Sequence, residues 1–253
     1  MTPCLRAQTL VDLENATWTH PTGPSTGWNS SQLTGYTDLS DGNRVTMTVS
    51  FAGTGTPTAG NLTILNESFF TGFAFQMDPA TNTNGASFLN YERIDLEFDQ
   101  AVQFDDFRIT DVDRAGWDDV LFAEGWNGSG GVGALGSGTT ANYSFNTTTN
   151  LGTEILYGHE MVVVTTGGNT VNGPESDLFI DFGGSLVDAV SLYYWNGDYA
   201  ATDTTQTIGL TATTGEQGFF VTTPAPEPST AIFLLVGFAA LLFYRPLRAT
   251  QAA

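Results

Sequence analysis

The stretch Val45-Thr46-Met47-Thr48-Val49-Ser50-Phe51 alternates apolar and polar side chains with a period of two. Successive side chains of a β-strand point to opposite faces, so this pattern predicts a strand with one face in a core. Related patterns recur at residues 71–77, 94–98, 104–109, 161–165, 178–182, 187–195 and 208–212. No segment before residue 229 has the apolar spacing of an amphipathic helix. The body of the chain is therefore predicted to be all-β.

The number of predicted strands favours two antiparallel sheets packed as a β-sandwich, most simply a jelly-roll-like one, over residues 8–222. The segment Asn127–Asn150 is rich in Gly, Ser, Thr and Asn. It predicts a long loop with at most one short strand near Tyr143–Phe145. Residues 107–113 followed by 117–120 resemble a strand, acidic loop and strand unit of bacterial surface jelly rolls.

The composition limits the kind of partner. The 253 residues include 27 acidic and 7 basic side chains, all of the latter Arg, which gives a net charge of −20. Such a surface repels phosphates, so no nucleic-acid partner is expected. Cys4 is the single cysteine and cannot form an internal disulfide.

The C-terminal residues have a three-part order. Pro226-Glu227-Pro228-Ser229 is followed by the uncharged apolar run Ala231–Tyr244 and then by Arg245 and Arg248. An apolar run with a basic end predicts a membrane helix whose Arg residues stay on the cytoplasmic side.

This order resembles the PEP-CTERM sorting signal. We expect residues 223–228 to form a Pro-rich linker that carries the PEP motif, and residues 229–248 to form a transmembrane sorting helix with its basic end. The resemblance implies export, transient anchoring in the inner membrane, and processing by an exosortase, a membrane cysteine transpeptidase-like enzyme. It also implies a Gram-negative host that makes exopolysaccharide, which is then a candidate partner.

An exported protein needs a signal peptide, and residues 1–7 lack an apolar stretch long enough to form one. We expect them to be the remnant of a truncated signal peptide, whose remainder lies in frame upstream of Met1.

Four carboxylates, Asp111, Asp113, Asp118 and Asp119, fall within nine residues beside a turn at Gly116. Calcium prefers six to eight oxygen ligands, which clustered carboxylates and backbone carbonyls supply. The cluster is thus a candidate calcium site, and a solvated acidic turn is the alternative. No cofactor is expected to be required, and calcium is the candidate ligand.

Aromatic side chains are candidates for carbohydrate binding, because their faces stack on the apolar faces of sugars. The candidates are Trp117, Trp126, Tyr193 and Trp195. Strand aromatics pack in cores more often than they bind ligands, so a core role is the alternative.

These observations favour a non-enzymatic protein of the cell surface or extracellular matrix, with an adhesive, structural or carbohydrate-binding role. No catalytic residues are selected by any motif. A secreted carbohydrate-active enzyme is the alternative, because a glycosidase needs only two facing carboxylates, and acidic residues are abundant.

Overall fold

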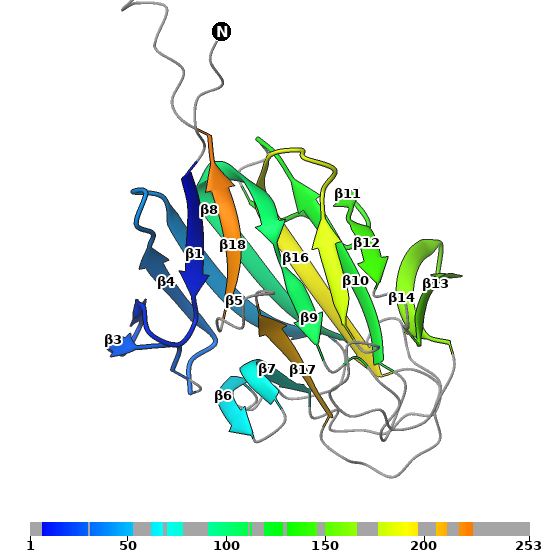
Figure 1. Cartoon of the computed structure of the whole chain (residues 1–253), viewed down its shortest axis with the longest axis horizontal. Coiled ribbons are helices and arrows are strands. Elements are labelled where there is room, and N and C mark those ends of the chain that lie inside the picture. The colour runs from blue at the N-terminus through cyan, green and yellow to red at the C-terminus, as the bar shows by residue number, and fades with distance from the viewer. Residues whose placement is uncertain are drawn as a thin grey trace, which may run out of the picture.

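The computed structural model describes residues 7–29, 31–52, 62–67, 70–77, 91–110, 112, 119–128, 131–145, 150–165, 177–196, 206–211 and 218–224. These residues form antiparallel strands joined by turns and contain no helix, which confirms the all-β prediction (Figure 1). No helix long and apolar enough to span a membrane occurs in this described part of the chain. The helix predicted at 229–248 lies outside it.

The larger sheet has the order β13-β14-β10-β16-β8-β5-β4-β2-β3, with β1 and β18 joined to it through β8 and β11 joined through β10. Its strands are β1 (Ala7–Asp12), β2 (Thr17–His20), β3 (Gly23–Thr26), β4 (Thr34–Asp38), β5 (Arg44–Ala52), β8 (Tyr91–Asp106), β10 (Asp119–Trp126), β11 (Thr139–Thr140), β13 (Leu151–Leu156), β14 (His159–Val164), β16 (Val187–Asn196) and β18 (Gly218–Thr223).

The second sheet has the order β12-β15-β9-β17-β7-β6. Its strands are β6 (Leu62–Glu67), β7 (Phe70–Met77), β9 (Arg108–Thr110), β12 (Asn142–Phe145), β15 (Leu178–Asp181) and β17 (Gln206–Thr211). One hydrophobic cluster contains residues of both sheets, among them Met47 and Leu96 of the larger sheet and Ile109, Ile180 and Leu210 of the second. A core shared in this way is typical of a sandwich-like arrangement.

Strand β5 shows how the alternation builds this core. Val45, Met47 and Val49 are buried with at most 3% exposure, whereas Thr46 and Thr48 between them are half-buried. The period-two pattern therefore predicted both the strand and the buried face correctly.

Strand β8 is the longest strand and connects two parts of the fold. Its first half, from Tyr91 to Phe98, lies between β5 and β16, and its last residues pair with β18. The strand predicted at 104–109 is interrupted at Phe107, because β8 ends at Asp106 and the chain passes there into β9 of the other sheet. The predicted loop 127–150 contains the expected short strand, β12, and also the two-residue strand β11.

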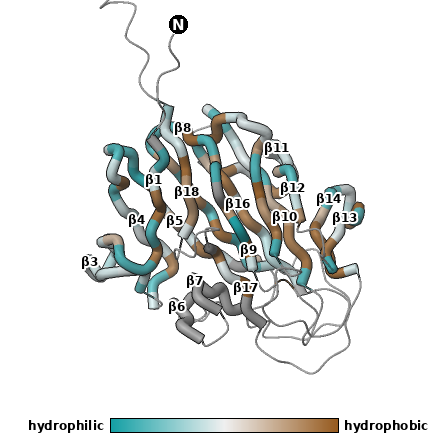
Figure 2. The backbone as a smooth tube through the Cα atoms, viewed as in Figure 1, coloured by the Kyte–Doolittle hydropathy of each residue, from teal (hydrophilic) through white to brown (hydrophobic). Residues whose placement is uncertain are grey.

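The larger sheet is buried on both faces around β10, β14 and β16. Its inner face contributes to the shared core, and its outer face carries a second cluster that consists of Val120, Phe122, Met161, Val163, Tyr193 and Trp195. Figure 2 shows hydrophobic positions along β10 and β16 in brown. A strand buried on both faces reads as a nearly continuous apolar run, and Val187–Trp195 has that composition.

The first and the last described strands of the chain, β1 and β18, pair with each other. β1 runs antiparallel to β18, with Ala7 opposite Thr223 and Asp12 opposite Gly218 (Figure 1). The backbone at Gly218 leaves no room for a side chain, because a Cβ atom there would lie 1.9 Å from the carbonyl oxygen of Val11. The start of β1 and the end of β18 therefore lie side by side.

Candidate functional site

Several residues singled out from the sequence lie outside the described residues, so their predictions stay predictions. They are Asp111, Asp113, Asp118 and Trp117 of the acidic loop, and Pro226, Glu227, Pro228, Ser229, Arg245 and Arg248 of the sorting motif. The residues that the structure does place are Asp119, Trp126, Tyr193 and Trp195.

Asp119 is a buried acid at the start of β10, with 1% of its surface exposed. On β10, Leu121 and Ala123 belong to the shared core, so the strand alternation places Asp119 on this inner face. Its Oδ1 accepts a hydrogen bond from the hydroxyl of Tyr194, which is itself 1% exposed. Asp119 is therefore an inward-facing carboxylate and no part of a solvated turn.

Glu92 is a second buried acid on the same inner face. It lies on β8 opposite Tyr194, two residues before Ile94 and four before Leu96, both of which belong to the core. The residue is 1% exposed, and neither carboxylate oxygen has a hydrogen-bond partner. Burial raises the pKa of Glu92 well above its ordinary value, because the charged form loses its hydration.

The burial of Glu92 is indicated by its position in the alternating pattern, although the residue belongs to no recognised motif. In Glu92-Arg93-Ile94-Asp95-Leu96, the alternation places the glutamate on the apolar side of the strand, where an unpaired acid is rare. A glutamate in phase with core positions is a marker of a functional or ligand-binding group. Within the described residues, no group of three or more His, Cys, Asp or Glu side chains is placed to hold a metal ion.

The aromatic candidates for sugar stacking are buried. Tyr193 and Trp195 are 0% and 1% exposed, and their rings stack with centroids 5.7 Å apart. Trp126 is 8% exposed, and its Nε1 donates a hydrogen bond of 3.4 Å to Ser137 Oγ. Each ring lies on the outer face of the larger sheet, and none presents a free ring face in this conformation.

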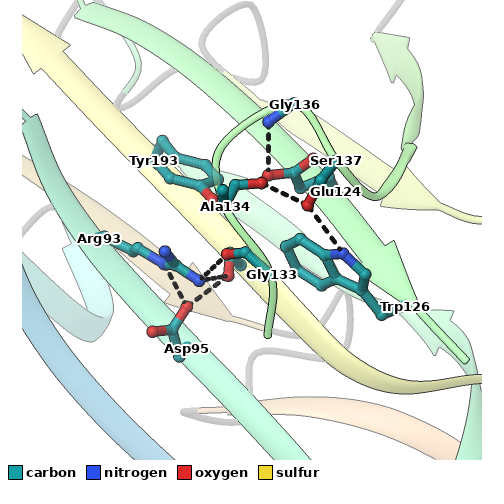
Figure 3. A network of polar contacts seen from close by, with 10 residues as sticks. Arg93, Asp95, Glu124, Trp126, Gly133, Ala134, Gly136, Ser137 and Tyr193 are labelled. Atoms are coloured by element: carbon teal, nitrogen blue, oxygen red, sulfur yellow. Dashed lines mark hydrogen bonds and ion pairs between the residues drawn. The ribbon is translucent and has the colours of Figure 1, made fainter. Parts of the chain in front are cut away.

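A polar network holds the segment Gly131–Gly138 against this face, and Figure 3 shows its contacts at Gly133, Gly136 and Ser137. Glu124 of β10 is fully buried, and its carboxylate accepts three hydrogen bonds. The donors are the Tyr193 hydroxyl at 2.8 Å, the Gly136 N–H at 3.0 Å and the Gly138 N–H at 2.8 Å. Burial and the adjacent Glu124 carboxylate raise the pKa of the Tyr193 hydroxyl, which keeps it protonated as a donor.

A second charged group holds the other end of the segment. Arg93 of β8 donates to Asp95 Oδ1 at 2.6 Å, to Ser191 Oγ at 3.1 Å and to the Gly133 carbonyl at 3.0 Å (Figure 3). Its guanidinium carbon also lies 5.2 Å from the centre of the Tyr193 ring. Two mostly buried charges, on the two strands that flank β16, thus fix a glycine-rich segment over the Tyr193 ring.

A cleft of about 300 Å³ lies farther along the larger sheet, at the start of β5, the middle of β8 and the start of β16. Three carboxylates, Glu97, Asp99 and Asp188, line it together with Gly131, and its lining contains no basic residue. This cleft repels anions, but a cluster of partly exposed acids is also what a strongly acidic surface produces by itself.

Comparison of the chain with protein-family models, curated proteins and solved structures found no match.

Proposed function

We propose that this chain is an exported cell-envelope protein, anchored transiently in the inner membrane by a PEP-CTERM tail and then located at the cell surface or in the extracellular matrix. The observation that carries the proposal is the order of Pro226-Glu227-Pro228-Ser229, the apolar run Ala231–Tyr244, and Arg245 and Arg248. The exosortase that recognises this tail and the exopolysaccharide outside the cell are its partners.

The β-domain is compatible with a tether at one point. Because the start of β1 pairs with the end of β18, a tail that follows Thr223 leaves the domain at one edge of the larger sheet. A domain arranged in this way keeps its fold when the tail is cut.

The domain has a jelly-roll-like sandwich fold in this proposal, and its role is adhesive or structural. The support for this topology is that β8 lies between β5 and β16, strands far apart in the sequence, while the second sheet interleaves β9, β15 and β17. Carbohydrate binding at Tyr193 would require the segment Gly131–Gly138 to leave the sheet. A structural role within the polysaccharide matrix needs no such movement.

The test is localisation in a Gram-negative host with and without its exosortase, with a cleavable signal peptide fused before Ala7. The variant changes Pro226, Glu227 and Pro228 to Ala together, and Pro224→Ala is the matched control. We expect the wild type and the control to lose the tail and reach the surface. The variant should remain in the inner membrane at full length. Equal distribution of variant and wild type in both hosts would refute the proposal.

A further inference from the structure

We propose that the open edge of β13 binds an extended, basic segment of another protein, which joins the larger sheet as an additional antiparallel strand. This interaction surface goes beyond the proposed envelope function and does not depend on the tail. β13 ends the strand order of the larger sheet, and β14 is the one strand that pairs with it in the described part of the chain (Figure 1). Addition of a strand to an open sheet edge is a recurring mode of peptide recognition.

The register of the β13–β14 pair shows which backbone groups face this edge. The Thr165 N–H donates to the Asn150 carbonyl at 2.8 Å, one pair beyond the ladder. Because hydrogen-bonded pairs alternate with non-bonded pairs along antiparallel strands, the backbone groups of Glu154 bond to β14. The N–H and C=O groups of Thr153 and Ile155 point the other way, to the open edge, and both residues are exposed. Each of them offers one donor and one acceptor to an incoming strand.

The opposite end of the larger sheet is protected against such an addition. β3 ends the strand order there, and the Gly27 N–H donates to the Ala16 carbonyl one pair beyond its ladder with β2. The same alternation turns the groups of Ser25 to β2 and those of position 24 to the edge. That position is Pro24, which has no N–H, and proline on an edge strand is a common protection against further pairing. β13 contains no proline, so its edge lacks this protection.

The side chains along β13 select the kind of strand that fits. Thr153 and Ile155 are in phase with Leu151, a residue of the shared core, but Ile155 is 71% exposed and leaves an apolar group uncovered. Glu154 projects to the opposite face and is exposed, and neither β13 nor β14 contains an arginine. A strand that fits this edge therefore carries apolar side chains beside Ile155 and a basic side chain opposite Glu154.

A second copy of this chain does not have this chemistry. Two β13 strands that pair Thr153 of each copy with Ile155 of the other place the two Glu154 side chains directly opposite each other. Like charges in that position destabilise a sheet, and a net charge of −20 makes two copies repel each other. A basic segment is attracted by the same charges.

The probe is a labelled peptide, Thr-Arg-Val-Arg-Val-Arg-Thr, whose binding to the full chain is measured by fluorescence anisotropy. In the proposed register its central Arg lies opposite Glu154, and its two Val N–H groups point to β13. A peptide with Glu at the centre should bind about 2–30-fold more weakly. Glu154→Arg should reverse this preference. The matched control Asp99→Arg reverses an exposed acid on β8, which β14, β10 and β16 separate from β13, and should keep the preference.

Two methylated peptides test whether the backbone pairs. N-methylation of both Val residues removes the donors that face β13 and should abolish binding, whereas N-methylation of the two outer Arg residues, whose N–H groups point away, should preserve it. Ile155→Pro, which gives β13 the protection that Pro24 gives β3, should also abolish binding. Bound peptide should slow hydrogen exchange at the Thr153 and Ile155 amides and leave the Glu154 amide unchanged, because that amide is already in the ladder.

Three results would overturn the proposal. The first is equal binding of the two methylated peptides, or no binding of the unmodified one. The second is an unchanged charge preference in Glu154→Arg, because the peptide would then bind elsewhere. The third is a concentration-dependent dimer of the full chain in sedimentation that Ile155→Pro abolishes, because the edge would then belong to a second copy.

Discussion

Replacing Glu124 by alanine should destabilise the protein by about 3–5 kcal/mol. The side chain is fully buried and accepts hydrogen bonds from Tyr193, Gly136 and Gly138. A hydrogen bond to a charged group contributes about 1.5–3 kcal/mol, but the three contributions do not add. Gly136 is exposed and Gly138 half-buried, so water can replace the carboxylate there, whereas the buried Tyr193 hydroxyl is left without an acceptor.

The measurement is urea and thermal unfolding, followed by tryptophan fluorescence. For a domain of this size, a loss of 3–5 kcal/mol corresponds to a Tm lower by about 6–20 °C. Glu124→Gln, which keeps one acceptor oxygen, should lie between the wild type and Glu124→Ala. The control is Glu154→Ala on β13, where the side chain is exposed and a change within about 0.5 kcal/mol is expected.

Hydrogen exchange separates the loss of the network from a general loss of stability. The amides of Gly136 and Gly138 should exchange faster in Glu124→Ala even under conditions where the rest of the domain stays protected. If Glu124→Ala is no less stable than Glu154→Ala, and the two amides exchange as in the wild type, the assignment of Glu124 as the group that holds this segment is wrong.

Three further predictions concern other buried groups. The raised pKa of Glu92 contributes stability that is complete below its unfolded pKa of about 4.3 and is lost as pH rises toward its folded pKa. Glu92→Gln should therefore flatten this part of the pH profile in urea unfolding. Gly218→Ala should cost about 1–3 kcal/mol in the same assay, because its Cβ must displace the β1 backbone at Val11, and a cost near zero would show that the β1–β18 pair adjusts freely. Arg93→Met should cost about 3–5 kcal/mol by leaving the charge of Asp95 without a basic partner and with only the Ser191 hydroxyl as donor, and adding Asp95→Leu should restore part of that loss.

Local patterns in the sequence were sufficient for the main strands of the core. The alternation at Val45–Phe51 predicted β5 and its buried face, and the apolar run at Val187–Trp195 predicted β16. Neither the alternation nor the apolar composition indicated which segment covers the outer face of β16, because that segment lies far from β16 in the sequence.

The pairing of β1 with β18 shows why other parts of the fold were not predictable. Ala7 and Thr223 are opposite each other, and neither strand has a strong alternating pattern of its own. Their pairing is decided by the long-range register of β18 on β8, which no local window contains. The same limit applies to the break at Phe107, where the chain changes sheets without a Gly or Pro to mark it.

The segment Gly131–Gly138 reads as a flexible linker in the sequence, because Gly and Ser leave the backbone free. In the structure the same residues are held in place, because Glu124 and Arg93 provide an acceptor and a donor that its backbone groups reach. The lack of side chains is what permits this: a Cβ atom at Gly138 would lie 2.9 Å from the carbonyl oxygen of Gly125. The composition predicted a loop here. The conformation of this loop is determined by Glu124 and Arg93, which lie on strands distant in the sequence.

Glu92 and Glu124 differ in how the fold accommodates a buried acid. Both are glutamates with at most 1% exposure on the larger sheet, and they lie on opposite faces of it. The protein surrounds Glu124 with three donors, so its charge is compensated by the fold itself. The protein supplies no hydrogen-bond donor to Glu92, although burial of an acid without a partner lowers the stability of the fold. A leucine at this position would fit the apolar face. The fold compensates the charge of Glu124 with donors, whereas burial raises the pKa of Glu92 and so favours the protonated, neutral form of this acid in the apolar interior.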